Sequence, residues 1–183
     1  MNTANKLTML RMVLIPLFIF FALWQAPYFD ILAFATFLIA SLTDYFDGYI
    51  ARKRNMITDF GKFLDPLADK FLVVAAFTCM VADQSLSVWI LFAVIMREFA
   101  VMGIRMVAAS AGTVIAAGFF GKVKTVMQLI FILMVLFPVN LGLETVLGGI
   151  TITNWLGILV AAVTVASGLE YIIANRSVLS DKE

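Results

Sequence analysis

Four aspartates lie close together in an otherwise apolar part of the chain: Asp44, Asp47, Asp65 and Asp69. A carboxylate at the centre of a membrane helix costs roughly 2.5 to 3.5 kcal/mol on insertion scales, so a group of them requires a compensating partner. Metal ions, protons and substrates are the partners that could offset this cost. The four aspartates are therefore the candidate site from which the chemistry of the chain can be sought.

The spacing of these aspartates predicts two helical faces. Asp44 and Asp47 are three residues apart, and Asp65 and Asp69 are four apart. The members of each pair therefore lie on one face of a helix, with their Cβ atoms about 5 to 6 Å apart. Two ionised carboxylates at about 4 Å repel each other by roughly 4 kcal/mol at an effective dielectric constant of 20. Divalent cations would relieve that repulsion, and pairs of them are a recurrent arrangement in phosphoryl transfer.

The residue types that the chain lacks limit its chemistry. It contains no histidine and a single cysteine, Cys79, among its 183 residues. Histidine is the commonest general base and metal ligand, so acid–base chemistry falls to Asp, Glu, Lys or Tyr. The same absence argues against zinc, whereas carboxylate oxygens suit Mg, Mn or Ca ions. Any metal is therefore expected to be a hard divalent cation.

Other residues around the aspartates suit a ligand that carries phosphate. Gly48 and Gly61 leave space beside the carboxylates, and Ala51 adds only a small side chain to the same helical face. Arg52 supplies a planar guanidinium, which can hold a phosphate through two hydrogen bonds. If three of the acids bind metal, the fourth is available as a base.

The elements that must position these residues are apolar helices. The chain is 63% hydrophobic, and its mean hydropathy of +1.03 is far above that of a soluble domain. This composition predicts an all-α integral membrane protein with one domain, residues 1–183. Six transmembrane helices are expected, with a short N-terminal interfacial segment. Their approximate ranges are 10–26, 29–52, 62–82, 86–108, 118–138 and 150–173.

The charges of the connections predict the orientation of these helices. The links around 27–30, 83–86 and 139–149 contain acidic residues but no lysine or arginine. Basic residues flank the opposite ends of the helices, so both termini are expected in the cytoplasm. Asp44 then lies in the cytoplasmic leaflet, because about fifteen helical residues, each rising 1.5 Å, separate it from Phe29. A site at this depth could meet a lipid headgroup and a soluble molecule.

A second group of charged residues is basic and consists of Arg97, Arg105, Lys122 and Lys124. The two arginines are eight residues apart on one helical face, and the two lysines open the next helix. The positive-inside rule explains a lysine such as Lys122, but not Arg97, which lies more than two turns inside an apolar run. The group therefore predicts an anionic second substrate.

The complete array around the aspartates is identified as the signature of the CDP-alcohol phosphotransferase family. It reads Asp44-x2-Asp47-Gly48-x2-Ala51-Arg52-x8-Gly61-x3-Asp65-x3-Asp69, and all eight defining positions are present. The resemblance implies the six-helix membrane fold of that family, a homodimer and two divalent cations, Mg or Mn. It also implies transfer of a phosphatidyl or phosphoalcohol group from a CDP-linked donor, with release of CMP.

The resemblance further implies a role for each residue of the array. Asp44, Asp47 and Asp65 resemble the metal ligands of the family. Asp69 is also implied as part of the metal site, and it resembles the residue that accepts a proton in catalysis. The implied contacts to the nucleotide and pyrophosphate are Gly48, Ala51, Arg52, Thr58 and Gly61.

Four longer stretches resemble bacterial phosphatidylglycerophosphate synthases within this family; they are residues 5–11, 97–105, 121–125 and 167–171. This resemblance implies CDP-diacylglycerol as donor and glycerol-3-phosphate as acceptor, with the active site on the cytoplasmic side of the bacterial cytoplasmic membrane. The candidate ligands of the acceptor phosphate are Arg97, Arg105, Lys122 and Lys124. Asn5, Thr8 and Arg11 either border the site or cap and anchor the interfacial segment.

Three alternatives remain open, and none of them involves nucleic acid. Related synthases that use inositol phosphate or serine share the aspartate array, so the choice of acceptor depends on the stretch from Arg97 to Thr125. A carboxylate-based proton or cation carrier would also place acids inside apolar helices, although it has no need of Gly48 or Arg52 at fixed positions. An inactive scaffold is disfavoured by the four intact aspartates.

Overall fold

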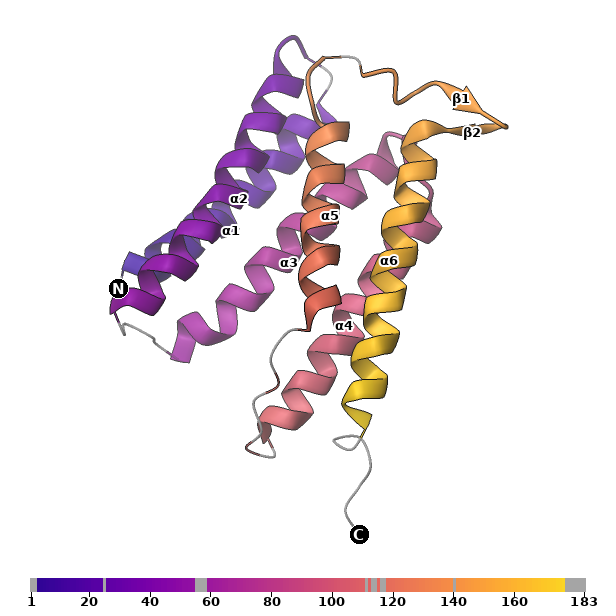
Figure 1. Cartoon of the computed structure of the whole chain (residues 1–183). Helices are drawn as coiled ribbons and strands as arrows, with labels where there is room; N and C mark the ends of the chain where they lie inside the picture. The colour runs from indigo at the N-terminus through magenta and orange to yellow at the C-terminus, as the bar shows by residue number, and fades with distance from the viewer. Residues whose placement is uncertain are drawn as a thin grey trace. The chain divides into compact units, whose positions relative to one another are not determined.

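The computed structural model contains six helices and one short β-hairpin in the part of the chain that it describes (Figure 1). The described backbone comprises residues 3–24, 26–54, 59–110, 112, 115, 118–139 and 141–176; within it the side chains of 3–8, 44–54, 59–66 and 69 are not described. The helices are α1 (Thr3–Leu23), α2 (Phe29–Arg54), α3 (Asp59–Ala82), α4 (Val88–Ser110), α5 (Phe119–Val135) and α6 (Ile152–Ala174).

The six helices expected from the sequence are all present in the described residues, but three boundaries differ from the expected ones. The sequence predicts a separate N-terminal interfacial segment, whereas α1 is helical from Thr3 and incorporates those residues. α1 also ends at Leu23, three residues before the expected end at 26. Ala26 precedes a proline, and a residue in that position is disfavoured in helical conformation. Likewise, α5 ends at Val135, shortly before Pro138.

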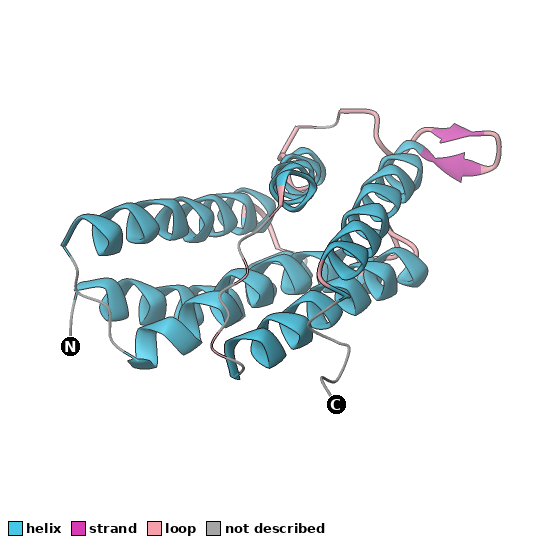
Figure 2. Cartoon of the chain, turned by 60° about the horizontal axis from the view of Figure 1, so that its bottom comes forward, coloured by secondary structure: helices cyan, strands magenta, loops and turns pink. Residues whose placement is uncertain are grey.

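The hairpin before α6 was not expected. Its strands, β1 (Val146–Leu147) and β2 (Ile150–Thr151), are antiparallel and lie directly before α6 (Figure 2). Gly148 and Gly149 form the turn with φ values of 63° and 82°, a conformation that two-residue hairpin turns require and glycine adopts readily. Thr151 then caps α6, because its Oγ1 accepts a hydrogen bond from the Asn154 backbone N–H at 3.3 Å.

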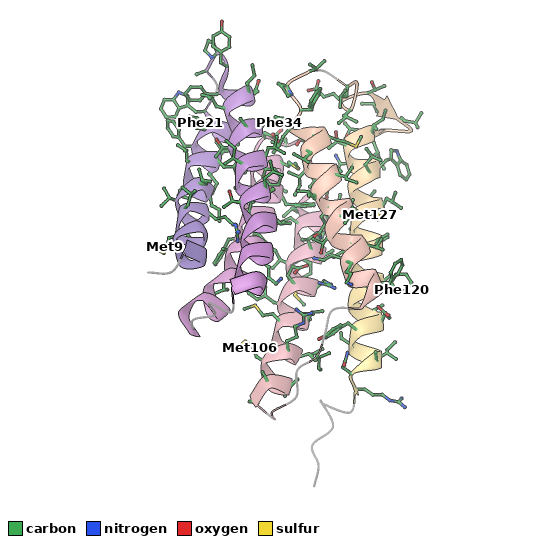
Figure 3. The ribbon with its side chains drawn as sticks, turned by 60° about the vertical axis from the view of Figure 1, so that its left-hand side comes forward. Met9, Phe21, Phe34, Met106, Phe120 and Met127 are labelled. Atoms are coloured by element: carbon green, nitrogen blue, oxygen red, sulfur yellow. The ribbon has the colours of Figure 1, made fainter. Side chains whose placement is uncertain are left out.

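The chain forms two compact units, and the first consists of residues Met1–Gln84 and Ile132–Gly142. In this unit α1 packs against both α2 and α3. Phe18 and Phe37 are fully buried between α1 and α2, with ring centres 5.6 Å apart. Figure 3 shows Met9 and Phe21 at opposite ends of α1. α1 therefore supports both helices that carry the aspartates. The expectation of a single domain over the whole chain stays a prediction.

The second unit consists of residues Ser85–Phe131 and Leu143–Glu183, and in it α4 packs against α6 (Figure 1). Gly157 permits their close approach, because a Cβ there would lie 2.9 Å from Cδ1 of Ile90 in α4. Asn154 fixes the start of α6: its Oδ1 accepts from the Ser87 backbone N–H at 2.8 Å, and its Nδ2 donates to the Ser85 carbonyl at 3.1 Å. Packing and hydrogen bonds thus hold α4 and α6 together along this unit.

One helix in the described residues, α6, is long and apolar enough to cross a membrane. Shorter apolar stretches lie in α1, α2 and α3: Met9–Leu23, Phe29–Thr43 and Lys70–Ala82. The three tryptophans of the chain, Trp24, Trp89 and Trp155, are exposed and lie at helix ends opposite those flanked by basic residues. Tryptophan is enriched at the interface between membrane and water. The described residues therefore confirm a helical fold with six helices, one of which is a candidate membrane span, and the prediction that all six cross a membrane stays a prediction.

Candidate active site

The four aspartates lie in two helices of the first unit. Asp44 and Asp47 belong to α2, and Asp65 and Asp69 belong to α3. Both helices are continuous across these positions, so each pair occupies one helical face, as the spacing predicts. Only four residues, 55–58, separate α2 from α3, which limits the distance between the two helix ends to about 17 Å. The fold therefore keeps the two pairs on consecutive helices that share α1 as a neighbour.

The side chains of the whole array, including those of Ala51 and Arg52, are not described. The backbone at Gly48 and Gly61 is helical, whereas Thr58 is outside the description altogether. The roles of these residues in binding metal, nucleotide and pyrophosphate therefore stay predictions. Among the side chains that are described, no group of three or more His, Cys, Asp or Glu could hold a metal ion.

Arg11 is the member of the N-terminal group whose side chain is described, and it is 1% exposed. It lies in α1, which packs against the two helices that carry the aspartates. A buried guanidinium needs hydrogen bonds or opposite charge in place of water. Its burial means that the charge lies within the first unit, and whether it borders the site stays a prediction. The side chains of Asn5 and Thr8 lie outside the described residues.

The basic group lies in the second unit, where two of its members share one carboxylate. The Lys124 Nζ donates to Glu98 Oε1 and also to Gln128 Oε1, the latter at 3.1 Å. The Arg97 Nη1 donates to the same Glu98 oxygen at 3.3 Å. Glu98 and Lys124 are each 5% exposed, and the Arg97 side chain is 9% exposed. One buried carboxylate of α4 therefore contacts two cations, and its contact with Lys124 joins α4 to α5.

The other two basic residues have different surroundings. The Arg105 Nε donates to Tyr171 Oη at 3.2 Å, and its guanidinium carbon lies 5.7 Å from the centre of the Tyr171 ring. This geometry combines a hydrogen bond with a cation–π contact and ties α4 to α6. Lys122 is exposed in the first turn of α5. The four residues that the sequence groups together are thus one buried cation, Lys124, one that is largely buried, Arg97, and two that are exposed.

Three buried polar residues beside this group were not expected from the sequence. The Gln128 Nε2 donates to Thr164 Oγ1 at 3.2 Å, and the Ser167 Oγ donates to the Thr164 carbonyl at 2.8 Å. Gln128 follows Lys124 by four residues, a spacing that places both on one helical face and could have revealed it. Thr164 gives no such signal, because its partner is 36 residues away in the chain.

Comparison with known proteins identifies the family of the chain. A family model described as CDP-alcohol phosphatidyltransferase matches residues 1–167, a range that contains both helices with aspartates and the basic group. The chain belongs to the CDP-alcohol phosphatidyltransferase family. This match confirms the resemblance inferred from the aspartate array. Members of this family are enzymes. The apolar helix α6 and the family together indicate a membrane protein.

Similar proteins of known name cover nearly the whole chain. One from Bacillus subtilis (strain 168), named CDP-diacylglycerol--glycerol-3-phosphate 3-phosphatidyltransferase, is 40% identical, and the alignment covers 97% of both chains. Proteins of the same name from Shigella flexneri serotype 5b (strain 8401) and Escherichia coli (strain K12) are each 34% identical. Those two alignments cover 99% of this chain and 98% of the relatives. The likeness therefore extends through both compact units.

The aliphatic stem of Arg97 packs against Gly168 of α6. A substitution of this glycine therefore tests whether the position of Arg97 matters for activity. A Cβ added to Gly168 would lie 2.8 Å from Arg97 Cγ, closer than real Cβ contacts, so Gly168→Ala must displace the arginine. We expect this substitution to lower transferase activity about tenfold or more, because displacing a binding group by about 1 Å can cost about a hundredfold. Activity is measured as CMP release by purified protein in detergent.

Gly103→Ala is the matched control, because a Cβ at Gly103 in α4 meets no atom within 4 Å. This variant is expected to keep both wild-type activity and the wild-type melting temperature. If Gly168→Ala and Gly103→Ala show equal activity, the position of Arg97 does not matter for transfer.

Proposed function

We propose that this chain transfers the phosphatidyl group of CDP-diacylglycerol to glycerol-3-phosphate, with phosphatidylglycerophosphate and CMP as products. The observation that carries this proposal is the similarity, over nearly the full chain, to relatives named for this reaction. The unbroken aspartate array supports the donor half of the reaction, and the basic group supports an anionic acceptor. The product is an anionic lipid precursor.

Two divalent cations, Mg or Mn, are proposed as cofactors. The donor set suits them, because four aspartates on two consecutive helices offer only hard oxygen ligands, and each pair shares a helical face. Asp44, Asp47 and Asp65 are assigned as ligands, with Asp69 beside them. When bound, such cations hold phosphate oxygens and neutralise the charge that develops during phosphoryl displacement.

The chain itself would supply the base and the binding groups. Asp69 accepts the proton of the acceptor hydroxyl, whose oxygen forms a bond to the lipid-side phosphorus of the donor. The bond from that phosphorus to the oxygen of CMP breaks, and the electron pair leaves with CMP. Arg52 would hold the pyrophosphate through charge-assisted hydrogen bonds. The other proposed contacts to nucleotide and pyrophosphate are Gly48, Ala51, Thr58 and Gly61.

The acceptor phosphate is proposed to bind the basic group: Arg97, Arg105, Lys122 and Lys124. The surroundings of these residues support two different roles, binding the phosphate and attracting it from solution. The Arg97 side chain is only 9% exposed, and its Nε makes no hydrogen bond to any described residue. The Nε–H group is therefore available to donate to an anion. Arg105 and Lys122 are exposed and can attract an anion from solution.

We further propose that all six helices span the bacterial cytoplasmic membrane, with both termini and the active site on the cytoplasmic side, and that the protein is a homodimer. The distribution of basic residues and the three tryptophans at the opposite helix ends support this orientation. The aspartates and basic residues interrupt the apolar sequences of α2, α3 and α4, as expected of spans that contain a site.

The proposed reaction is tested by product analysis with a panel of acceptors. Purified protein is treated with a chelator and given CDP-diacylglycerol with glycerol-3-phosphate, inositol phosphate or serine, before and after addition of Mg or Mn. Phosphatidylglycerophosphate should form only with glycerol-3-phosphate and only after metal is added, with one CMP released per lipid. A product with another acceptor would change the substrate assignment, and full activity in chelator would contradict the metal assignment.

The role of Asp69 is tested by Asp69→Asn, which keeps the shape of the side chain but removes its ability to accept a proton. A general base contributes about a hundredfold to ten-thousandfold to a rate, so we expect CMP release to fall by about a thousandfold at an unchanged melting temperature.

Asp83→Asn serves as the control, because Asp83 is an exposed aspartate directly after α3, outside the array. It should retain wild-type turnover. Normal CMP release by Asp69→Asn would rule out Asp69 as the base.

A further inference from the structure

Glu98 is a buried carboxylate that the proposed reaction does not use. It lies in α4, and the same oxygen, Oε1, contacts Arg97 Nη1 and Lys124 Nζ. Two cations and one carboxylate leave these three side chains with a net charge of +1, in a place where water is nearly excluded. A shared carboxylate of this kind fixes the positions of both cations relative to each other.

The contact with Glu98 occupies only one edge of the Arg97 guanidinium. Nη1 donates to the carboxylate, whereas Nε is buried and has no hydrogen-bond partner among the described residues. Nη2 lies 3.5 Å from the position that a Cβ on Gly121 would occupy, and this glycine adds no side chain there. Nε and Nη2 form the side edge of the guanidinium, whose two parallel N–H groups match two oxygens of a phosphate.

The rest of Arg97 is held by packing. Gly168 of α6 lies so close that a Cβ there would be 2.8 Å from Arg97 Cγ and 3.7 Å from its Cβ. The stem is therefore confined at one end, and the bond from Nη1 to Glu98 confines the guanidinium at the other. Together these contacts determine the direction in which the Nε and Nη2 edge points.

Lys124 holds Glu98 in place from the neighbouring helix. Its Nζ contacts Glu98 and Gln128, and the Gln128 side chain continues to Thr164 in α6, which is fully buried. The carboxylate is thus connected to α5 and α6 by a continuous series of hydrogen bonds. A buried network of this kind restricts its members to one arrangement when all of them have partners.

We propose that Glu98 is a positioning residue for the acceptor: it orients Arg97 so that Nε and Nη2 together receive the phosphate of glycerol-3-phosphate. This inference rests on the function proposed above. Glu98 is itself an anion beside a site for an anion, so its direct electrostatic effect on phosphate is unfavourable. If Glu98 acts by positioning Arg97, removal of its charge weakens the binding of glycerol-3-phosphate. If it acts only through direct electrostatics, removal of its charge strengthens that binding.

The first test is Glu98→Gln, assayed with both substrates varied. Loss of the carboxylate charge weakens its contacts with Arg97 and Lys124, so we expect the KM for glycerol-3-phosphate to rise about tenfold or more. The KM for CDP-diacylglycerol should stay within about twofold of wild type. Direct electrostatics alone predicts the opposite result, a lower KM for glycerol-3-phosphate, and that outcome or an unchanged KM would overturn the proposal. Glu98→Asp, which keeps the charge, should give an intermediate KM.

A second pair of variants covers the case in which Glu98→Gln does not fold because Lys124 is left buried beside a neutral group. Lys124→Met keeps Glu98 on Arg97, whereas Glu98→Leu combined with Lys124→Met removes both charges and leaves Arg97 without its acceptor. Replacement of a buried ion pair by apolar residues commonly preserves folding. The KM for glycerol-3-phosphate should be about tenfold higher in the double variant than in Lys124→Met. Equal values would overturn the role of Glu98.

Glu144→Gln is the control, because Glu144 is an exposed acid in the link before the hairpin. It should leave both KM values unchanged. If the wild-type protein makes no product from glycerol-3-phosphate, the proposed function and this inference both fail. If the wild-type protein uses glycerol-3-phosphate but the Glu98 variants do not change its KM, only the inference about Glu98 fails.

Discussion

A charged side chain inside an apolar helical protein must have a partner, and this constraint determines most of what the chain can do. Transfer of a charge out of water is far more costly than transfer of an apolar group, unless opposite charge and hydrogen bonds replace the water. The second unit meets the constraint with one carboxylate, Glu98, which contacts Arg97 and Lys124. In the first unit, Arg11 is buried in a helix that packs against both helices carrying the aspartates.

The two charged groups have opposite signs and suit opposite ligands. In the proposed function, the aspartates of α2 and α3, an array without histidine or cysteine, bind hard divalent cations and, through them, the pyrophosphate of a CDP-linked donor. The basic residues of α4 and α5 are proposed to bind the soluble phosphate of the acceptor. Glu98 accepts from Nη1 of Arg97, whereas Nε has no partner among the described residues, and this arrangement is the basis for proposing that an anchored guanidinium binds the phosphate. A transferase that joins a lipid phosphate to a phosphorylated alcohol needs both kinds of site.

The sequence was sufficient to predict the helices and the placement of the aspartates on them. The apolar runs correspond to six helices, and the spacing of three and four residues places each aspartate pair on one face. Local patterns of this kind are decided within one helix. The hairpin before α6 could not be predicted from the sequence pattern, because its strands have only two residues each and depend on two glycines with positive φ.

The environment of each basic residue could not be read from the sequence. Arg97 and Arg105 share a helical face in the sequence, yet one is buried against Glu98 and the other lies on Tyr171. Glu98 is adjacent to Arg97, but the residues that complete the two environments, Lys124 of α5 and Tyr171 of α6, are distant in the chain. Gly168 is an example, because its importance comes from the stem of Arg97, which lies on another helix.

The most direct test of this account is an experimental structure of the protein with glycerol-3-phosphate and a divalent cation bound. The account predicts cation density at the carboxylates of Asp44, Asp47 and Asp65, with the phosphate of the acceptor within hydrogen-bond distance of Arg97 Nε and Nη2. It also predicts that Glu98 still contacts Nη1 in that state. A phosphate bound away from Arg97, or a cation bound away from the aspartates, would contradict it.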